Sequence, residues 1–114
     1  MKRFYREIVD HAIDQAKQSS HDTFTHGAVL LHRSKILATG FNNYILHAER
    51  DVFSNLKKTM AKRCGYTVFV VRVNRSGELR NSKPCQSCMS YLKFQNVHNV
   101  YYSTDSGIEK MVLQ

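Results

Sequence analysis

The first apolar pattern in the chain has the period of a helix. From about Tyr5 to Lys17, apolar residues recur three and four positions apart and form one broad face. The apolar residues of this face are Phe4, Tyr5, Ile8, Val9, Ala12, Ile13 and Ala16. We therefore expect an amphipathic helix here, followed by a loop at residues 19–22.

Shorter apolar runs follow, and these are predicted to be strands. Residues 28–31 and 36–38 are apolar throughout and are joined by polar residues 32–35, which indicates a hairpin within a sheet covered on both faces. Residues 66–71 form the strongest predicted strand by residue type, and residues 100–103 form another. After a turn at residues 104–107, residues 108–113 have room for a short last strand or a frayed end. A direct hairpin at this turn would make the last strand antiparallel to its neighbour.

Helical spacing returns in two further segments. The first is expected at residues 47–62, with an apolar stripe made of Ala48, Val52, Leu56 and Met60. The second is expected to start with Pro84 at its first position, because proline is favoured there, and to run to about Gln95. Met89 and Leu92 are expected to be buried by this helix.

The predicted order is therefore α-β-β-α-β-α-β, with a further strand at the end. Helices that alternate with buried strands predict an α/β sandwich layered around one sheet. The second and third helices each follow a strand, so their N-termini should meet at one end of the sheet, where α/β proteins commonly bind ligands.

Composition restricts the class of protein. A chain of 114 residues is long enough for one hydrophobic core, so we expect residues 1–114 to form a single domain. No apolar run approaches the roughly 20 residues that span a bilayer, and the basic N-terminus is not followed by the apolar segment of a signal peptide. We expect no membrane partner and an intracellular location, cytoplasmic or nuclear. The net charge of +8 suits a phosphate-bearing partner, a nucleotide or a nucleic acid, and equally a solvated basic surface.

Two cysteines and a distant histidine have the residue types and spacing of a zinc site. Cys85 and Cys88 form a C-x-x-C pair at the start of the third predicted helix, and His47 with Glu49 begins the second. Three protein ligands would leave the open position of a catalytic zinc site, whereas a fourth ligand, such as Cys64 or another histidine, would make a closed structural site. The order H-x-E followed by P-C-x-x-C is the signature of zinc-dependent nucleobase deaminases.

On these motifs and the order of elements, the chain resembles the zinc-dependent cytidine/deoxycytidylate deaminase superfamily over nearly its whole length. The resemblance implies a three-layer α/β/α sandwich of the cytidine deaminase type, with a mixed sheet of four to five strands. It implies Zn²⁺ as cofactor, with His47, Cys85 and Cys88 as ligands. It also implies that Glu49 is the catalytic residue that moves protons during the attack of water on the amine-bearing ring carbon.

The same resemblance suggests substrate contacts. Gly27 and Ala28 resemble the segment that lines the pocket, and Asn42 resembles a substrate-contacting asparagine. Tyr101 and Tyr102 lie where related proteins place pocket or stacking aromatics; only one of them can face the site, Tyr102 is the expected contact, and plain packing is the alternative. Tyr44 stands where the free-nucleoside enzymes have a glutamate that holds the ribose, and His47 stands where they usually have a third cysteine.

Three functions follow as hypotheses. The favoured one is deamination of a cytosine nucleoside or nucleotide to the uracil compound, with release of ammonia. The alternative is a polynucleotide deaminase that acts on cytosine or adenine in RNA or single-stranded DNA. The third is an inactive, zinc-stabilised module that binds nucleic acid. Phosphate contacts are expected from Arg72, Arg75, Arg80 and Lys83, His26 is expected to be an ordinary loop histidine, and a homo-oligomer is expected from the resemblance.

Overall fold

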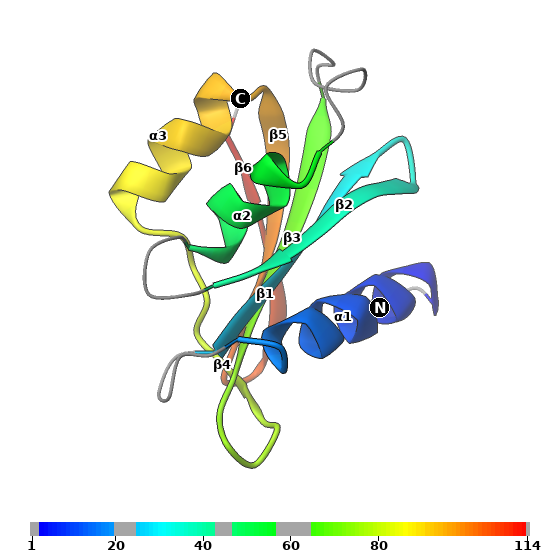
Figure 1. Cartoon of the computed structure of the whole chain (residues 1–114), viewed down its shortest axis with the longest axis vertical. Coiled ribbons are helices and arrows are strands. Elements are labelled where there is room, and N and C mark those ends of the chain that lie inside the picture. Colours follow the sequence, from blue (N-terminus) through cyan, green and yellow to red (C-terminus); the bar gives the residue numbers. More distant parts are fainter. Residues whose placement is uncertain (1–2, 20–24, 43–46, 57–64, 114) are drawn as a thin grey trace.

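A computed structural model describes residues 3–19, 25–42, 47–56 and 65–113 (Figure 1). Its helices are α1 (Arg3–Ala16), α2 (Ala48–Ser54) and α3 (Gln86–Phe94). Its strands are β1 (Thr25–His32), β2 (Lys35–Phe41), β3 (Tyr66–Val73), β4 (Leu79–Arg80), β5 (Val97–Thr104) and β6 (Gly107–Val112). The predicted order of elements is confirmed, with β4 as an addition.

The strands form one mixed sheet in the order β2-β1-β3-β5-β6, and β4 pairs with β3 beside this path. Only the β3–β5 pairing is parallel among the described strands; the others are antiparallel. Because β1 is antiparallel to β2 and to β3, the start of β1 lies beside the ends of β2 and β3. Polar residues at these three places therefore share one end of the sheet.

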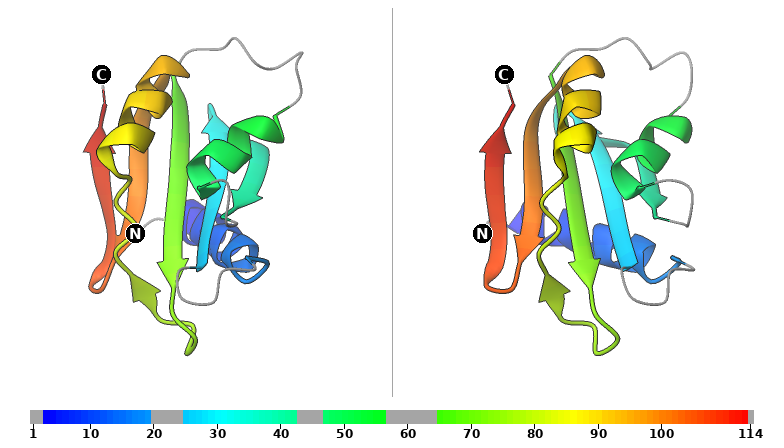
Figure 2. Two further views of the ribbon diagram at one scale, coloured as in Figure 1. Left: turned by 60° about the vertical axis from the view of Figure 1, so that its left-hand side comes forward. Right: turned by 90° about the vertical axis from the view of Figure 1, so that its left-hand side faces the viewer.

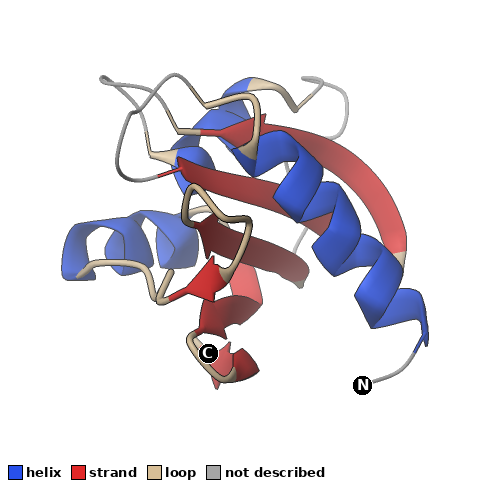
Figure 3. Cartoon of the chain, turned by 90° about the horizontal axis from the view of Figure 1, so that it is seen from below, coloured by secondary structure: helices blue, strands red, loops and turns tan. Residues whose placement is uncertain are grey.

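The helices cover both faces of the sheet. Figure 2 shows α2 and α3 on one face and α1 on the other, and Figure 3 shows the strands between them. The buried residues divide in the same way. Ala48, Val52 and Leu92 belong to the cluster on the α2 and α3 side, whereas Ile8 and Val9 belong to the cluster beneath α1. The three-layer α/β/α sandwich is thus confirmed.

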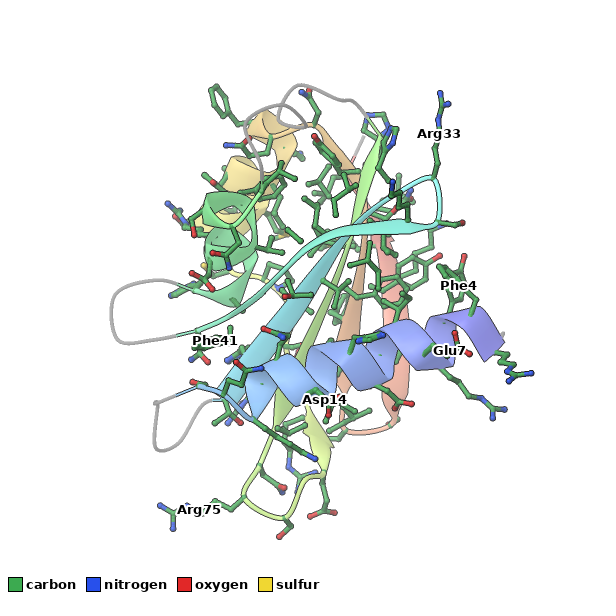
Figure 4. The ribbon with its side chains drawn as sticks, turned by 45° about the vertical axis from the view of Figure 1, so that its right-hand side comes forward. Phe4, Glu7, Asp14, Arg33, Phe41 and Arg75 are labelled. Carbon is green, nitrogen blue, oxygen red and sulfur yellow. The ribbon has the colours of Figure 1, made fainter. Side chains whose placement is uncertain are left out.

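The apolar face predicted for the first helix is the face that α1 buries. Ile8, Val9, Ala12 and Ala16 are buried against the sheet, while Glu7 and Asp14 are exposed on α1 (Figure 4). Strand β1 is buried continuously from Ala28 to Leu31, because α1 covers one of its faces and α2 the other. Its unbroken apolar run correctly indicated a strand covered on both sides.

An aromatic group extends the packing beneath α1. The rings of Phe69 and Tyr101 stack at 4.4 Å, and the Tyr101 hydroxyl lies 3.4 Å from the Tyr5 hydroxyl, to which it donates. Burial, and then the hydrogen bond and charge interaction with Tyr5, raise the pKa of Tyr101 to about 12. The phenol therefore stays neutral at physiological pH, as a packed ring requires.

Two glycines allow helices to approach strands closely. A Cβ atom at Gly27 would collide with the backbone of α1 at Ala12 and Ala16. A Cβ atom at Gly40 would lie 2.7 Å from the backbone nitrogen of Val52 in α2. Backbone atoms cannot move aside as a flexible side chain can, so both positions need glycine for helix–sheet packing.

Tight turns connect the strands and end the third helix. The β1–β2 hairpin has a two-residue loop in which Arg33 and Ser34 both have positive φ values, 51° and 68°. This is the conformation that matches the twist of two-residue hairpins, although glycine and asparagine are its usual residues. Asn96, with φ of 67°, follows the C-cap of α3 and turns the chain into β5.

Several boundaries differ from the predicted ones. The second helix ends at Ser54 with Asn55 as its C-cap, well before the predicted end at residue 62; residues 57–64 lie outside the described part. Pro84 is not the first residue of α3, because Cys85 has an extended N-cap conformation and the helix begins at Gln86. Met89 is half-buried, since it lies at the edge of α3 rather than beneath it, while Leu92 is buried.

The sheet is also slightly larger than predicted. It has six strands instead of four to five, because Leu79 and Arg80 in the predicted polar loop pair with Val73 and Arg72 of β3. The last segment forms a regular strand, β6, antiparallel to β5. Among the described residues, no helix has both the length and the apolar character needed to span a membrane.

We expect the substitution Gly27→Ala to lower the free energy of unfolding by about 1–3 kcal/mol, the usual cost of overpacking. The added methyl group would overlap the backbone of α1 at Ala12 and Ala16. Denaturant titration of the two proteins measures the difference. Shortening Gln15 to alanine in the variant should not restore stability, because the crowding atoms belong to the backbone; full restoration would contradict this account.

Candidate metal centre

The three predicted metal ligands lie at the N-termini of two helices. His47 is the N-cap of α2, with φ and ψ of −71° and 154°, and Cys85 is the N-cap of α3, with φ and ψ of −69° and 167°. An N-cap side chain normally accepts a hydrogen bond from the first turn of its helix, but neither residue does so. Both side chains are turned instead toward the space between the helices.

Their ligand atoms are close enough to share one ion. His47 Nδ1 lies 3.0 Å from Cys88 Sγ, and the ligand atoms of His47, Cys85 and Cys88 all lie within 4.8 Å of one another. Tetrahedral zinc with ordinary Zn–N and Zn–S bonds would place such atoms about 3.5–3.8 Å apart. Two soft sulfur atoms and one imidazole also suit zinc chemically, so the residues present fit the ion.

Side-chain contacts hold α2 against the sheet and thereby place His47. Asp51 Oδ2 accepts a hydrogen bond from the backbone N–H of Phe41 at 3.1 Å. Asn55 Nδ2 donates to the carbonyl of Thr39 at 2.8 Å. Together with the close approach at Gly40, these bonds attach the middle and the C-terminal end of the short helix to β2.

Arg50 connects the two metal-binding helices. Its Nη2 donates to Ser87 Oγ at 2.8 Å, and its guanidinium carbon lies 4.8 Å from the centre of the Tyr91 ring. Ser87 lies between Cys85 and Cys88, and Arg50 is in the turn of α2 that follows His47. A planar guanidinium can donate and stack at the same time, so this one side chain ties α2 to the first two turns of α3.

A cavity of about 180 Å³ opens beside the ligands. It is lined by His26, Asn42, His47, Ala48, Ser82, Lys83, Pro84 and Cys85. These residues come from the start of β1, the end of β2, the N-terminus of α2 and the loop before α3. The sheet topology described above brings all four segments to one end.

Asn42 is fixed in this cavity by two hydrogen bonds to one residue. Its backbone N–H donates to the carbonyl of His26 at 3.1 Å, and its Oδ1 accepts from the backbone N–H of His26 at 2.8 Å. Asn42 is only 7% exposed. These two bonds extend the antiparallel pairing of β1 with β2 by one residue, because the Asn42 side chain takes the place of a backbone acceptor. They fix the Asn42 amide in the cavity wall.

The other residues predicted to touch a substrate lie elsewhere. Ala28 is fully buried in the core beneath α2 and α3, and Gly27 faces α1 on the opposite side. Tyr102 is half-buried and packs against the same core as Ala28. Glu49 belongs to the first turn of α2, but its side chain, like Cys64 and Tyr44, lies outside the described part of the chain.

The structure adds three cavity residues that the motifs did not single out as such: His26, Ser82 and Lys83. His26 belongs to β1 and is therefore not the loop histidine that was expected. Its position directly before Gly27, which was expected to line the pocket, could have indicated that His26 lies near the cavity. Ser82 and Lys83 precede Pro84, and nothing in a short polar stretch distinguishes a cavity wall from an ordinary loop.

The sequence model of one protein family matches residues 2–104, and its description is cytidine and deoxycytidylate deaminase zinc-binding region. The match covers most of the chain, and the chain belongs to this family. Zinc is therefore its cofactor, and His47, Cys85 and Cys88 are the side chains in the described part of the chain that could together hold it. No curated protein matches the sequence.

Solved structures show the same fold at low sequence identity. A dCMP deaminase from the cyanophage S-TIM5 superposes with a TM-score of 0.69 at 22% identity, over 90% of this chain and 84% of that one. A cytidine deaminase from Mycobacterium leprae gives 0.67 at 22% identity, over 93% and 92%. A Thermotoga maritima diaminohydroxyphosphoribosylaminopyrimidine deaminase/5-amino-6-(5-phosphoribosylamino)uracil reductase gives 0.65 at 20% identity, over 87% of this chain and 29% of that one.

We expect Arg50→Ala to weaken zinc binding about 10-fold, the lower end of the effect of residues that support metal ligands. The reason is that Arg50 ties α2 to α3 through Ser87 and Tyr91. Competition with a chromophoric chelator measures the affinity. Lys93→Ala, which removes an exposed cation from α3, is the matched control and should bind zinc normally. If Arg50→Ala binds zinc as tightly as the wild-type protein, the contacts of Arg50 with α3 do not support the site.

Proposed function

We propose that this protein is a zinc-dependent hydrolytic deaminase of a cytosine nucleoside or nucleotide. The observation that carries the proposal is that His47 and Cys85 line the same cavity as the anchored Asn42, with Cys88 beside them. Zinc held by His47, Cys85 and Cys88 would supply a water molecule made acidic enough to react at neutral pH. Three protein ligands leave a coordination position for that water.

Glu49 is the proposed proton carrier. It follows His47 by two residues, in the first turn of α2, so its backbone is positioned by the same helix N-terminus as the metal ligand. It would take a proton from the attacking water and pass it to the ring nitrogen next to the reacting carbon. It would then take the second proton and deliver it to the amine, which leaves as ammonia while the ring carbon becomes a carbonyl.

Asn42 is the proposed substrate-positioning residue. Its Oδ1 accepts a hydrogen bond from the backbone N–H of His26, which fixes the side chain in the cavity wall, and an amide also carries N–H donors. Sugar hydroxyl oxygens and the cytosine carbonyl are acceptors that such a donor can bind. A fixed donor beside the metal would orient the ring carbon for attack, which is the contribution that positioning makes to catalysis.

The test is ammonia release from a panel of substrates by the zinc-loaded protein. The panel contains cytidine, deoxycytidine, their 5′-monophosphates, the adenine equivalents, a diaminopyrimidine nucleotide and short single strands of RNA and DNA. We expect turnover of a cytosine monomer and none by Cys85→Ser, which loses a ligand. Failure to deaminate any compound would leave only the zinc-stabilised binding module and overturn the proposal.

We expect Glu49→Ala to lose deamination while keeping zinc and the fold. Loss of one general acid–base group costs about 10²–10⁴ in rate, and Glu49 serves several proton transfers, so the upper end or more is expected. Steady-state ammonia release, with zinc content and thermal unfolding measured on the same sample, separates the two effects. Turnover near that of the wild-type protein would remove Glu49 from the mechanism.

The alternative substrate is a polynucleotide, and charge favours it. The chain has a net charge of +8, and Lys83 lies in the cavity wall. Two of the other cations expected to bind phosphate, Arg72 and Arg80, are paired neighbours on β3 and β4. The third, Arg75, lies on the loop between these strands, and its side chain points away from the sheet (Figure 4).

If a strand is the substrate, its affinity should fall steeply with salt, with a log–log slope of about −0.7 for each phosphate neutralised. Reversing the charges of Arg80 and Lys83 should make this slope shallower without changing the preferred base, because phosphate contacts position and do not specify. Fluorescence anisotropy with labelled single strands measures the slope. Arg75→Glu is the control and should leave the slope unchanged. Tight strand binding with no turnover of any monomer would overturn the preference for a small substrate and put the polynucleotide first.

A further inference from the structure

Two buried serines support the wall of the metal cavity, and one of them, Ser82, lines it. Ser82 is 3% exposed and belongs to the loop that leads to Cys85, and Ser103 is 0% exposed and belongs to β5. Buried hydroxyl groups need hydrogen-bond partners, and residues of this kind are retained where their bonds hold a segment in place.

The two serines bind each other through backbone and side chain. The backbone N–H of Ser82 donates to the carbonyl of Ser103 at 2.9 Å, and the backbone N–H of Ser103 donates to Ser82 Oγ at 2.7 Å. Their hydroxyl oxygens are 2.8 Å apart. This pair of residues, which we call the serine latch, attaches the loop before α3 to the interior of the sheet.

The latch also binds two further strands. Ser82 Oγ lies 2.8 Å from the carbonyl oxygen of Val70 in β3, and Ser103 Oγ lies 2.6 Å from that of Arg80 in β4. Ser103 Oγ accepts a hydrogen bond from the backbone N–H of Arg72 at 3.0 Å. Three short oxygen–oxygen contacts thus compete for two hydroxyl protons, so both hydroxyls are fully used inside the fold. The two hydroxyl groups therefore hold backbone segments in place.

Ser82 is close enough to Cys85 in the chain to control its position. Only Lys83 and Pro84 separate them, and Pro84 is buried with the φ angle that its ring imposes. Cys85 itself is exposed and, as the N-cap of α3, makes no side-chain capping bond. Its carbonyl accepts a hydrogen bond from the backbone N–H of Met89 in α3 at 2.9 Å, and the segment before Cys85 supplies the other constraint on its position. Cys88 differs, because it lies within the helix and is 1% exposed.

We propose that the serine latch of Ser82 and Ser103 is the positioning device for the metal ligand Cys85, and that Cys88 is held independently of it. The inference rests on the zinc ligands proposed above, but not on any substrate. It makes the two cysteines of one C-x-x-C motif unequal: loosening the latch should release Cys85 from the metal while Cys88 stays bound and buried.

The test uses the zinc-loaded protein and alkylation by iodoacetamide under native conditions. Both cysteines fall in one tryptic peptide, so tandem mass spectrometry is needed to measure the modification of Cys85 and of Cys88 separately. Ser82→Ala and Ser103→Ala should each raise the alkylation rate of Cys85 about 10-fold or more, the size of effect expected of groups that orient metal ligands. The rate at Cys88 should change little. Ser106→Ala, an exposed serine in the β5–β6 turn, is the matched control and should behave as the wild-type protein.

Conservative variants separate positioning from general stability. Ser82→Thr and Ser103→Thr keep the hydroxyl groups and should keep Cys85 protected. Equal increases at both cysteines would mean that the variants only unfold the chain more often, and unchanged protection of Cys85 would mean that the latch does not position it; either result overturns the proposal. If Ser82→Ala does not fold, Ser103→Ala and the two threonine variants give the same comparison. Zinc content of the wild-type protein, measured first, shows separately whether the metal site itself is correct.

Discussion

The contact between the N-terminal ends of two helices is the constraint on which the rest of the structure depends. His47 Nδ1 and Cys88 Sγ approach to 3.0 Å, although the residues are 41 positions apart in the chain. Neither α2 nor α3 could place its ligands alone, because α2 has only seven residues and is too short to be stable by itself. The sheet supplies the platform: β2 holds α2, and β3 with β5 holds the segment that leads to α3. A zinc ion bound between the helices would add its binding free energy to this assembly, since metal binding and folding are linked.

The two faces of the sheet differ in what they carry. The face beneath α1 is packed with apolar and aromatic side chains, and its glycine, Gly27, serves close approach to a helix. The opposite face carries α2, α3 and the metal site. Polar groups appear on it at the end of the strands, where His26, Asn42 and Ser82 line the cavity. Both faces are packed, and the site lies where the core beneath α2 and α3 ends. There, Asn42 and Ser82 are held by hydrogen bonds to other parts of the sheet.

Positioning in this protein is achieved largely by residues whose hydrogen bonds join separate parts of the fold. Asp51 and Asn55 fix α2, Arg50 ties it to α3, and the serine latch holds the loop before Cys85. Each of these contacts joins segments that are distant in sequence or belong to different elements. Family membership implies zinc, and these contacts show how the fold supports the candidate ligands.

Much of the architecture was determined by local sequence. The helical period of residues 4–16 predicted both α1 and the face it buries, and the unbroken apolar run of β1 predicted a strand covered on both sides. The spacing of Cys85 and Cys88 predicted a metal-binding segment, because residues three apart at the start of a helix lie close together whatever the rest of the fold does. Tertiary structure alone decided the other features. The early end of α2 and the two-residue strand β4 depend on contacts with β2 and β3, and the presence of His26 and Ser82 in the cavity wall depends on strand register and loop closure. Such contacts arise between segments far apart in the chain, and no periodicity within a single segment can record them.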